Sequence, residues 1–62
     1  MDEKIVKVPA HELESGMECK VKGGSDIVED VETDYANGWT MVCLAQRGEQ
    51  FVPMGTMIKV MS

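Results

Sequence analysis

The sequence has no long apolar run and few of the residues that build metal sites. The longest apolar segment is residues 41–45, far short of the roughly 20 residues that cross a bilayer, and residues 1–4 (Met-Asp-Glu-Lys) cannot open a signal peptide. One histidine and two cysteines fall short of the about four nitrogen or sulfur ligands that a zinc site needs. We therefore predict a cytoplasmic protein with no membrane contact, no metal and no cofactor.

The sequence also lacks the residue pairs from which catalytic sites are built. His11 lies beside Glu12, but no serine or cysteine next to them would act as a nucleophile, so we interpret His11 as a surface histidine on a turn. Cys43 lies in an apolar segment, without a neighbouring cation that would lower its pKa. We predict that the chain is not an enzyme, and that Cys19 and Cys43 are free thiols, because nothing points to an oxidising compartment.

Cations are in the minority, with 6 Lys and Arg against 11 Asp and Glu, for a net charge of -5. This balance disfavours nonspecific binding to nucleic acid phosphates and to anionic membranes, and it favours a protein partner with a basic surface. With 44% hydrophobic and 27% charged residues, the composition is that of a globular chain. We predict one small domain over residues 1–62, and we leave homo-oligomerisation open.

The centre of the chain predicts a β-hairpin. Asn37-Gly38 separates two runs rich in β-branched and apolar residues, which favours a two-residue type I′ turn with Ala36 opposite Trp39. This register places on the core face Ile27, Val31, Thr33, Tyr35, Val42 and Leu44. The other face then carries Asp30, Glu32, Asp34, Met41, Cys43 and Ala45. A three-residue loop, with Gly38 left-handed and Tyr35 opposite Trp39, is the alternative register.

Short elements are predicted before this hairpin. Residues 4–8 form a strand that Pro9 ends. Residues 10–16 suit a single helical turn, from which Leu13 enters the core. Residues 17–22 alternate strictly between apolar and charged side chains, which is the pattern of a half-buried strand.

Further short elements are predicted around and after the hairpin. A glycine-rich turn at residues 23–25 precedes it, and its second strand extends to about Gln46. A tight turn at residues 47–48 then leads to a strand over residues 49–52. A 3₁₀ turn over residues 53–56 and a last strand over residues 57–61 end the chain.

Five or six short strands, with turns about every ten residues, are typical of a small barrel. The predicted fold is therefore all-β: a small five- to six-stranded antiparallel barrel with short 3₁₀ turns. With its 3₁₀ turn just before the last strand, this arrangement resembles an SH3-like barrel, and the resemblance names an architecture rather than a function.

Residues 12–17 (Glu-Leu-Glu-Ser-Gly-Met) resemble the loop that opens the second strand in KOW-type translation-factor domains. This resemblance implies a nucleic-acid-associated domain, which Lys20 and Lys22 beside Gly23-Gly24 support. Those domains carry a functional lysine at the hairpin tip, whereas residues 35–39 contain none. A compact, acidic chain of this kind is also similar to small accessory proteins of bacteriophages and other mobile elements, which bind and redirect host proteins.

The predicted hairpin presents acidic and aromatic candidates for partner binding. The alternating carboxylates of one strand form a solvated face that prevents edge aggregation, a patch for a basic partner, or, least favoured, a calcium site. Tyr35 and Trp39 at the tip either anchor a partner or cap the core, and the methionines either fill the core or form an adaptable surface. The predicted partner-binding residues are Glu32, Asp34, Tyr35, Trp39, Met41 and Met57.

The sequence thus favours a non-enzymatic protein-binding module, in the manner of a phage or mobile-element accessory protein that binds a host protein. The alternative is a KOW-like domain associated with nucleic acid in translation or transcription.

Overall fold

The chain folds into six strands and one short 3₁₀ helix, and the computed structural model describes residues 4–61. In chain order the elements are β1 (Ile5–Pro9), η1 (Ala10–Glu12), β2 (Glu18–Val21), β3 (Gly24–Asp34), β4 (Trp39–Leu44), β5 (Gly48–Pro53) and β6 (Met57–Met61). All paired strands run antiparallel, which confirms the all-β prediction.

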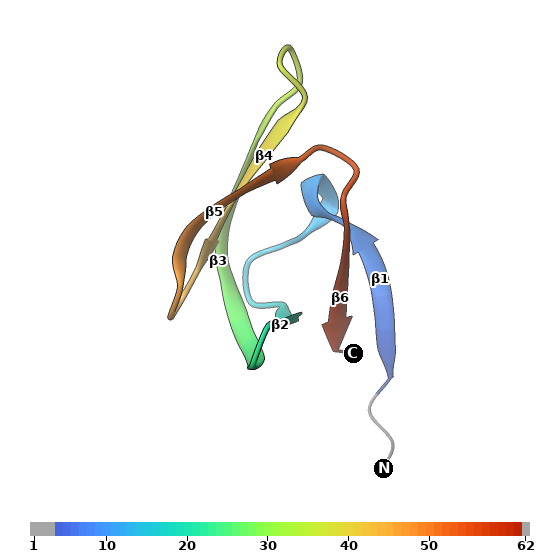
Figure 1. Cartoon of the computed structure of the whole chain (residues 1–62), viewed down its shortest axis with the longest axis vertical. Coiled ribbons are helices and arrows are strands. Elements are labelled where there is room, and N and C mark those ends of the chain that lie inside the picture. The colour runs from blue at the N-terminus through green and yellow to red at the C-terminus, as the bar shows by residue number, and fades with distance from the viewer. Residues whose placement is uncertain (1–3, 62) are drawn as a thin grey trace.

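The strands form one bent sheet in the order β1-β6-β2-β3-β4-β5 (Figure 1). β3 belongs to both halves of this sheet, because its first residues pair with β2 and its later residues pair with β4. β1 and β5 are the edges, and no pairing joins them within the described part of the chain. Six antiparallel strands are thus established, but the sheet is not closed within the described residues, so the predicted SH3-like barrel is not confirmed.

The tip of the β3–β4 hairpin differs from both predicted registers. Asp34 pairs with Trp39, so that the four residues 35–38 form the loop. The Asp34 carboxylate explains this, because it accepts hydrogen bonds from the Asn37 backbone N–H (3.2 Å) and side-chain amide (2.7 Å). Within the loop only Gly38 has a positive φ (76°), whereas a type I′ turn also requires one at Asn37.

The shift in register leaves most side chains on their predicted faces. The predicted type I′ register pairs Val42 with Thr33, whereas in the structure Val42 pairs with Val31, two residues away. An even shift of this kind preserves the alternation of side chains.

The core-face placement of Ile27 and Tyr35 was wrong. A β-bulge directly after Val28 inverts the alternation, so Val28 is buried and Ile27 is exposed. Tyr35 lies in the loop, where it is 71% exposed.

The turns on either side of β5 also differ from the prediction. Before β6, Gly55 has a φ of 89°, which a right-handed 3₁₀ turn does not contain, and the 3₁₀ helix of the described residues is η1 instead. β4 ends at Leu44 rather than at Gln46. The backbone N–H groups of Gln46 and Arg47 donate to the side chain of Asp26, which takes them out of the strand ladder.

The core is small and aliphatic. Its buried members are Ala10, Leu13, Cys19, Val28, Val42, Leu44 and Val60. Leu13 enters the core next to η1 and Cys19 points inward from β2, both as predicted. All three aromatic residues lie outside it, since Tyr35, Trp39 and Phe51 are 71%, 49% and 66% exposed. The largest apolar side chains of the chain therefore lie on its surface.

Candidate functional site

Three rows of side chains cross the outer face of β3, β4 and β5. Residues directly opposite one another in an antiparallel sheet share a face, so the pairings define these rows. They are Asp34 with Trp39 and Pro53, Glu32 with Met41 and Phe51, and Asp30 with Cys43 and Glu49. Carboxylates on β3 thus border an apolar strip on β4 and β5.

Residues of the first two rows line a shallow hollow of about 450 Å³, which we call the outer hollow. It is lined by Glu32, Thr33, Asp34, Trp39, Met41 and Phe51. Aromatic rings attract cations through the negative charge of their faces, and carboxylates attract them directly. The outer hollow therefore suits a ligand that joins an apolar stem to a positive charge, as lysine and arginine side chains do.

Asp34 supplies a constant negative charge at the edge of the outer hollow. Hydrogen bonds from the Asn37 side-chain amide and backbone N–H lower the pKa of its carboxyl, against a smaller opposite effect of desolvation. The group is therefore ionised at neutral pH, and its orientation is fixed by the same hydrogen bonds.

The pKa of both cysteine thiols is raised, which disfavours the thiolate form. Burial raises the pKa of the Cys43 thiol on the outer face, and the charges of Glu29, Glu49 and Asp30 raise it further. Burial and the charge of Asp26 raise the pKa of the Cys19 thiol. Both cysteines are free, and they lie on opposite faces of the sheet, Cys19 in the core and Cys43 outside.

Four of the six predicted partner-binding residues meet in the outer hollow, namely Glu32, Asp34, Trp39 and Met41. Tyr35 lies beyond them in the hairpin loop, and Met57 lies on β6 opposite Pro9 and does not line the hollow. Sequence reasoning missed Phe51. Its alternation with Val52 was the available signal, but its position beside Met41 follows only from the β4–β5 pairing.

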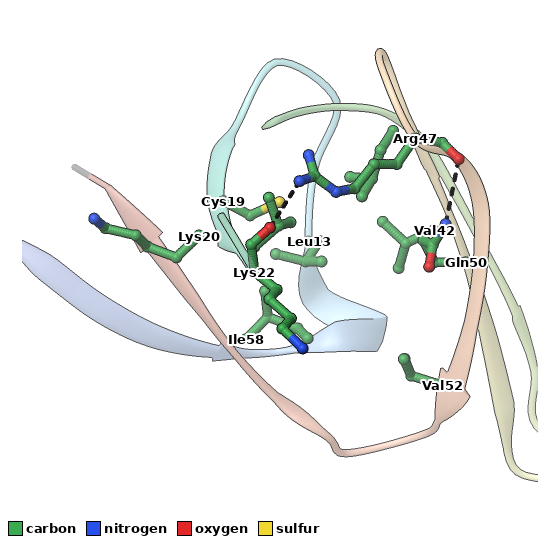
Figure 2. Close-up of a pocket in the computed structure, with 11 residues that line it drawn as sticks. Leu13, Cys19, Lys20, Lys22, Val42, Arg47, Gln50, Val52 and Ile58 are labelled. Atoms are coloured by element: carbon green, nitrogen blue, oxygen red, sulfur yellow. Dashed lines mark hydrogen bonds between the residues drawn. The ribbon is translucent and has the colours of Figure 1, made fainter. Parts of the chain in front are cut away.

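A second candidate site lies on the inner side of the bent sheet. This inner pocket has a volume of about 300 Å³ and is lined by Leu13, Cys19, Lys20, Val21, Lys22, Val42, Leu44, Arg47, Gln50, Val52 and Ile58. Figure 2 shows Leu13, Val42 and Ile58 reaching into one space from separate parts of the chain. The walls are largely apolar, and the polar groups stand at the rim.

The buried carboxylate of Asp26 contacts Arg47, one of the residues that line the inner pocket. It is 3% exposed and accepts backbone hydrogen bonds from Ile27 (2.8 Å), Gln46 (3.0 Å) and Arg47 (3.1 Å). The Arg47 guanidinium lies 3.6 Å away and also donates to the Lys22 carbonyl (2.8 Å; Figure 2). These contacts tie the β4–β5 loop to β3 and to the β2–β3 turn, and we call them the Asp26 clamp.

These contacts also determine the direction in which the pKa of Asp26 departs from its ordinary value. Burial by itself raises the pKa of a carboxyl, but the hydrogen bonds from Gln46, Ile27 and Arg47 and the charge of Arg47 lower it below its ordinary value. Asp26 is therefore a buried, ionised and fully partnered group. Its contacts explain a structural role and leave it without a free oxygen for a ligand.

The remaining titratable candidate is His11, which is half-buried in η1 rather than on the surface. Its Nε2 lies 3.7 Å from the Glu12 carboxylate. Within residues 4–61, no three His, Cys, Asp or Glu side chains are grouped to hold a metal ion. No helix in the same residues is long and apolar enough to cross a bilayer.

No protein-family model matches the chain, and no curated protein or solved structure matches it either.

Proposed function

We propose that the chain is a non-enzymatic protein-binding module that docks a basic segment of its partner on the outer hollow. The observation that carries the proposal is the position of Trp39 and Phe51, both exposed and both in one hollow with Glu32 and Asp34. Exposed aromatic residues dominate the energetics of interfaces, and they are costly to leave in water without a partner.

The chemistry of the partner follows from the neighbours of these rings. A lysine or arginine side chain places its methylene stem against Trp39, Met41 and Phe51 while its charge faces the carboxylates. The net charge of -5 adds long-range attraction for a basic surface, which raises the association rate. Met41 adapts its shape to different stems, because it is unbranched and flexible.

This mode of binding suits an accessory protein of the phage or mobile-element kind, which acts by occupying a surface of a host protein. The alternative, a KOW-like nucleic-acid-associated domain, draws support from three cations at the inner pocket, Lys20, Lys22 and Arg47. Arg47 is already engaged by Asp26 and by the Lys22 carbonyl, so fewer charges are left for phosphates. We therefore favour the protein partner.

A peptide array tests the proposal directly. Peptides that place lysine or arginine between apolar residues are expected to bind, and their lysine-acetylated or glutamine-substituted copies are expected to bind weakly. Trp39→Ala and Phe51→Ala should each weaken binding about 30-fold, which corresponds to a hot spot of about 2 kcal/mol. Glu32→Lys should slow association and flatten its dependence on salt.

Met57→Ala is the matched control, because Met57 is equally exposed but lies outside the outer hollow. It should leave binding unchanged. If folded Trp39→Ala and Phe51→Ala proteins bind the basic peptides as well as the parent does, the outer hollow is not the docking site. Binding to a nucleic acid duplex with a steep salt dependence would instead favour the KOW-like alternative.

A further inference from the structure

The inner pocket lies where the sheet is not closed within the described residues. β5 and β6 follow one another in the chain but are not neighbours in the strand order, and the pocket is lined by inward side chains of both, Val52 and Ile58. Val21, Val52 and Ile58 face this space and are only half-buried, although they pack against the core. These aliphatic groups would lose contact with water if a ligand entered.

The charge at the rim is opposite to that of the outer hollow. Lys20, Lys22 and Arg47 all belong to the pocket, in a chain with only 6 Lys and Arg. Figure 2 shows the Lys20 side chain directed away from the pocket and the Lys22 side chain lying across it in this view. No hydrogen bond or ion pair occupies the Lys22 ammonium within the described part of the chain.

We propose that the inner pocket binds a small amphipathic carboxylate, with its aliphatic chain among Leu13, Val52 and Ile58 and its carboxylate at Lys22. An apolar cavity with one convergent charged group at its mouth is the usual form of a small-molecule site. The volume of about 300 Å³ lies at the lower end for such sites, which favours a medium-length chain over a bulky ligand.

Each part of the proposed ligand has a matching group in the inner pocket. The aliphatic chain replaces water against half-buried valine and isoleucine side chains, and the carboxylate pairs with the Lys22 ammonium, which has no ion pair or hydrogen bond with another described residue. The residues that line the pocket include no Asp or Glu. The buried, ionised carboxylate of Asp26 is paired with Arg47 and with three backbone N–H groups, which offsets its repulsion of an anionic ligand.

Titration with sodium butanoate, hexanoate and octanoate, followed by NMR below the concentrations that form micelles, tests the site. The affinity should rise about threefold to fourfold for each added methylene until the pocket is full. Resonances of Leu13, Val21, Val52 and Ile58 should shift, while those of Trp39 on the opposite face should not. 1-Octanol, which has the same chain without the charge, should bind more weakly than octanoate.

Two lysine variants separate the roles of charge and position. Lys22→Gln should weaken octanoate binding severalfold and leave 1-octanol binding unchanged. The matched control, Lys20→Gln, should change neither, because the Lys20 side chain points away. Val21→Phe, at a half-buried wall position, should block both ligands while the protein remains folded by circular dichroism.

Three results would overturn the proposal. The first is an affinity for carboxylates that does not depend on chain length, and the second is an equal loss of affinity in Lys20→Gln and Lys22→Gln. The third is a concentration-dependent dimer, by sedimentation, whose interface shifts the same pocket resonances without ligand, because a second copy of the chain would then be the occupant. None of these results bears on the outer hollow, whose rings face the other way.

Discussion

The outer hollow and the inner pocket lie on opposite faces of β4 and differ in shape, polarity and charge. Trp39, Met41 and Cys43 point outward, whereas Thr40, Val42 and Leu44 point inward. The outer face gathers aromatic rings and carboxylates that are exposed to solvent. The inner face gathers the aliphatic core and cations, so one strand supplies both the proposed binding surface and core side chains on the other face.

The two faces should differ most in how much stability is lost when one large apolar side chain on each is truncated. Leu44→Ala removes a buried core side chain and should lower the free energy of unfolding by about 2 to 5 kcal/mol, against a total of about 3 to 9 kcal/mol for a chain of this length. Phe51→Ala removes a larger but exposed side chain and should change it by less than about 0.5 kcal/mol. Urea denaturation of both variants measures the difference, and equal losses would contradict the division between the two faces.

Two carboxyl groups with lowered pKa values, those of Asp26 and Asp34, should make the stability of the fold depend on pH to different extents. Since the pKa of Asp26 is lower in the folded than in the unfolded chain, the stability it confers is present above its ordinary pKa. This stability is lost as the pH falls through the folded value. Asp26→Asn should therefore remove much of the acid dependence of the unfolding midpoint, with a large loss of stability at neutral pH.

Asp34 is the matched control for Asp26, because its pKa is also lowered but its side chain is exposed in the outer hollow. Asp34→Asn should flatten the acid dependence only slightly, since solvent weakens the interactions of an exposed charge. Midpoints of urea unfolding between about pH 6 and about pH 2 provide the measurement. A larger effect for Asp34 than for Asp26 would show that the clamp does not stabilise the fold.

Substitutions in the hairpin loop that borders the outer hollow should have a smaller effect on folding stability. Gly38→Val forces a β-branched residue into the left-handed region and should cost about 1 to 2 kcal/mol of stability. Ala36→Val introduces the same side chain into the same loop, at a residue without a positive φ, and should cost less than about 0.5 kcal/mol. Thermal unfolding of the two variants gives the comparison, and similar midpoints would rule out a left-handed Gly38.

The smallest expected effect is a gain in stability on the inner face. The Thr40 hydroxyl is fully buried and has no hydrogen-bond partner among the described residues. Thr40→Val keeps the shape of the side chain and removes the unsatisfied group, so it should stabilise the protein by about 1 kcal/mol. Thr33→Val, at the half-buried residue opposite, should give a smaller gain in the same unfolding assay. A loss of stability in Thr40→Val would mean that the hydroxyl is hydrogen-bonded in solution.

Much of this arrangement follows from local sequence patterns. The alternation in β2 predicted that Cys19 points inward, and the alternation in β3 and β4 predicted that Glu32, Asp34 and Met41 share a face. These predictions succeeded because the side-chain period of a strand survives an even error in register. The error itself arose because the Asp34 side chain competes with the turn that Asn37-Gly38 favours alone.

Other features depend on contacts that no local pattern contains. The β-bulge after Val28 exchanged the expected roles of Ile27 and Val28, and nothing in their side chains distinguishes the two. The partners of Asp26 lie 20 and 21 residues further along the chain, so an acidic residue beside a glycine turn gave no sign of burial. Phe51 joined the outer hollow only through the pairing of β5 with β4.

The Asp26 clamp has a mechanical consequence. β3 is the one strand that runs through both halves of the sheet, and its bulge marks the point at which the two halves meet. A rotation about this hinge would open or narrow the gap between β2 and β5 while the ladders on either side stayed intact. The clamp spans the gap from the β2–β3 side to the β4–β5 loop, so such a rotation would have to stretch or break its hydrogen bonds.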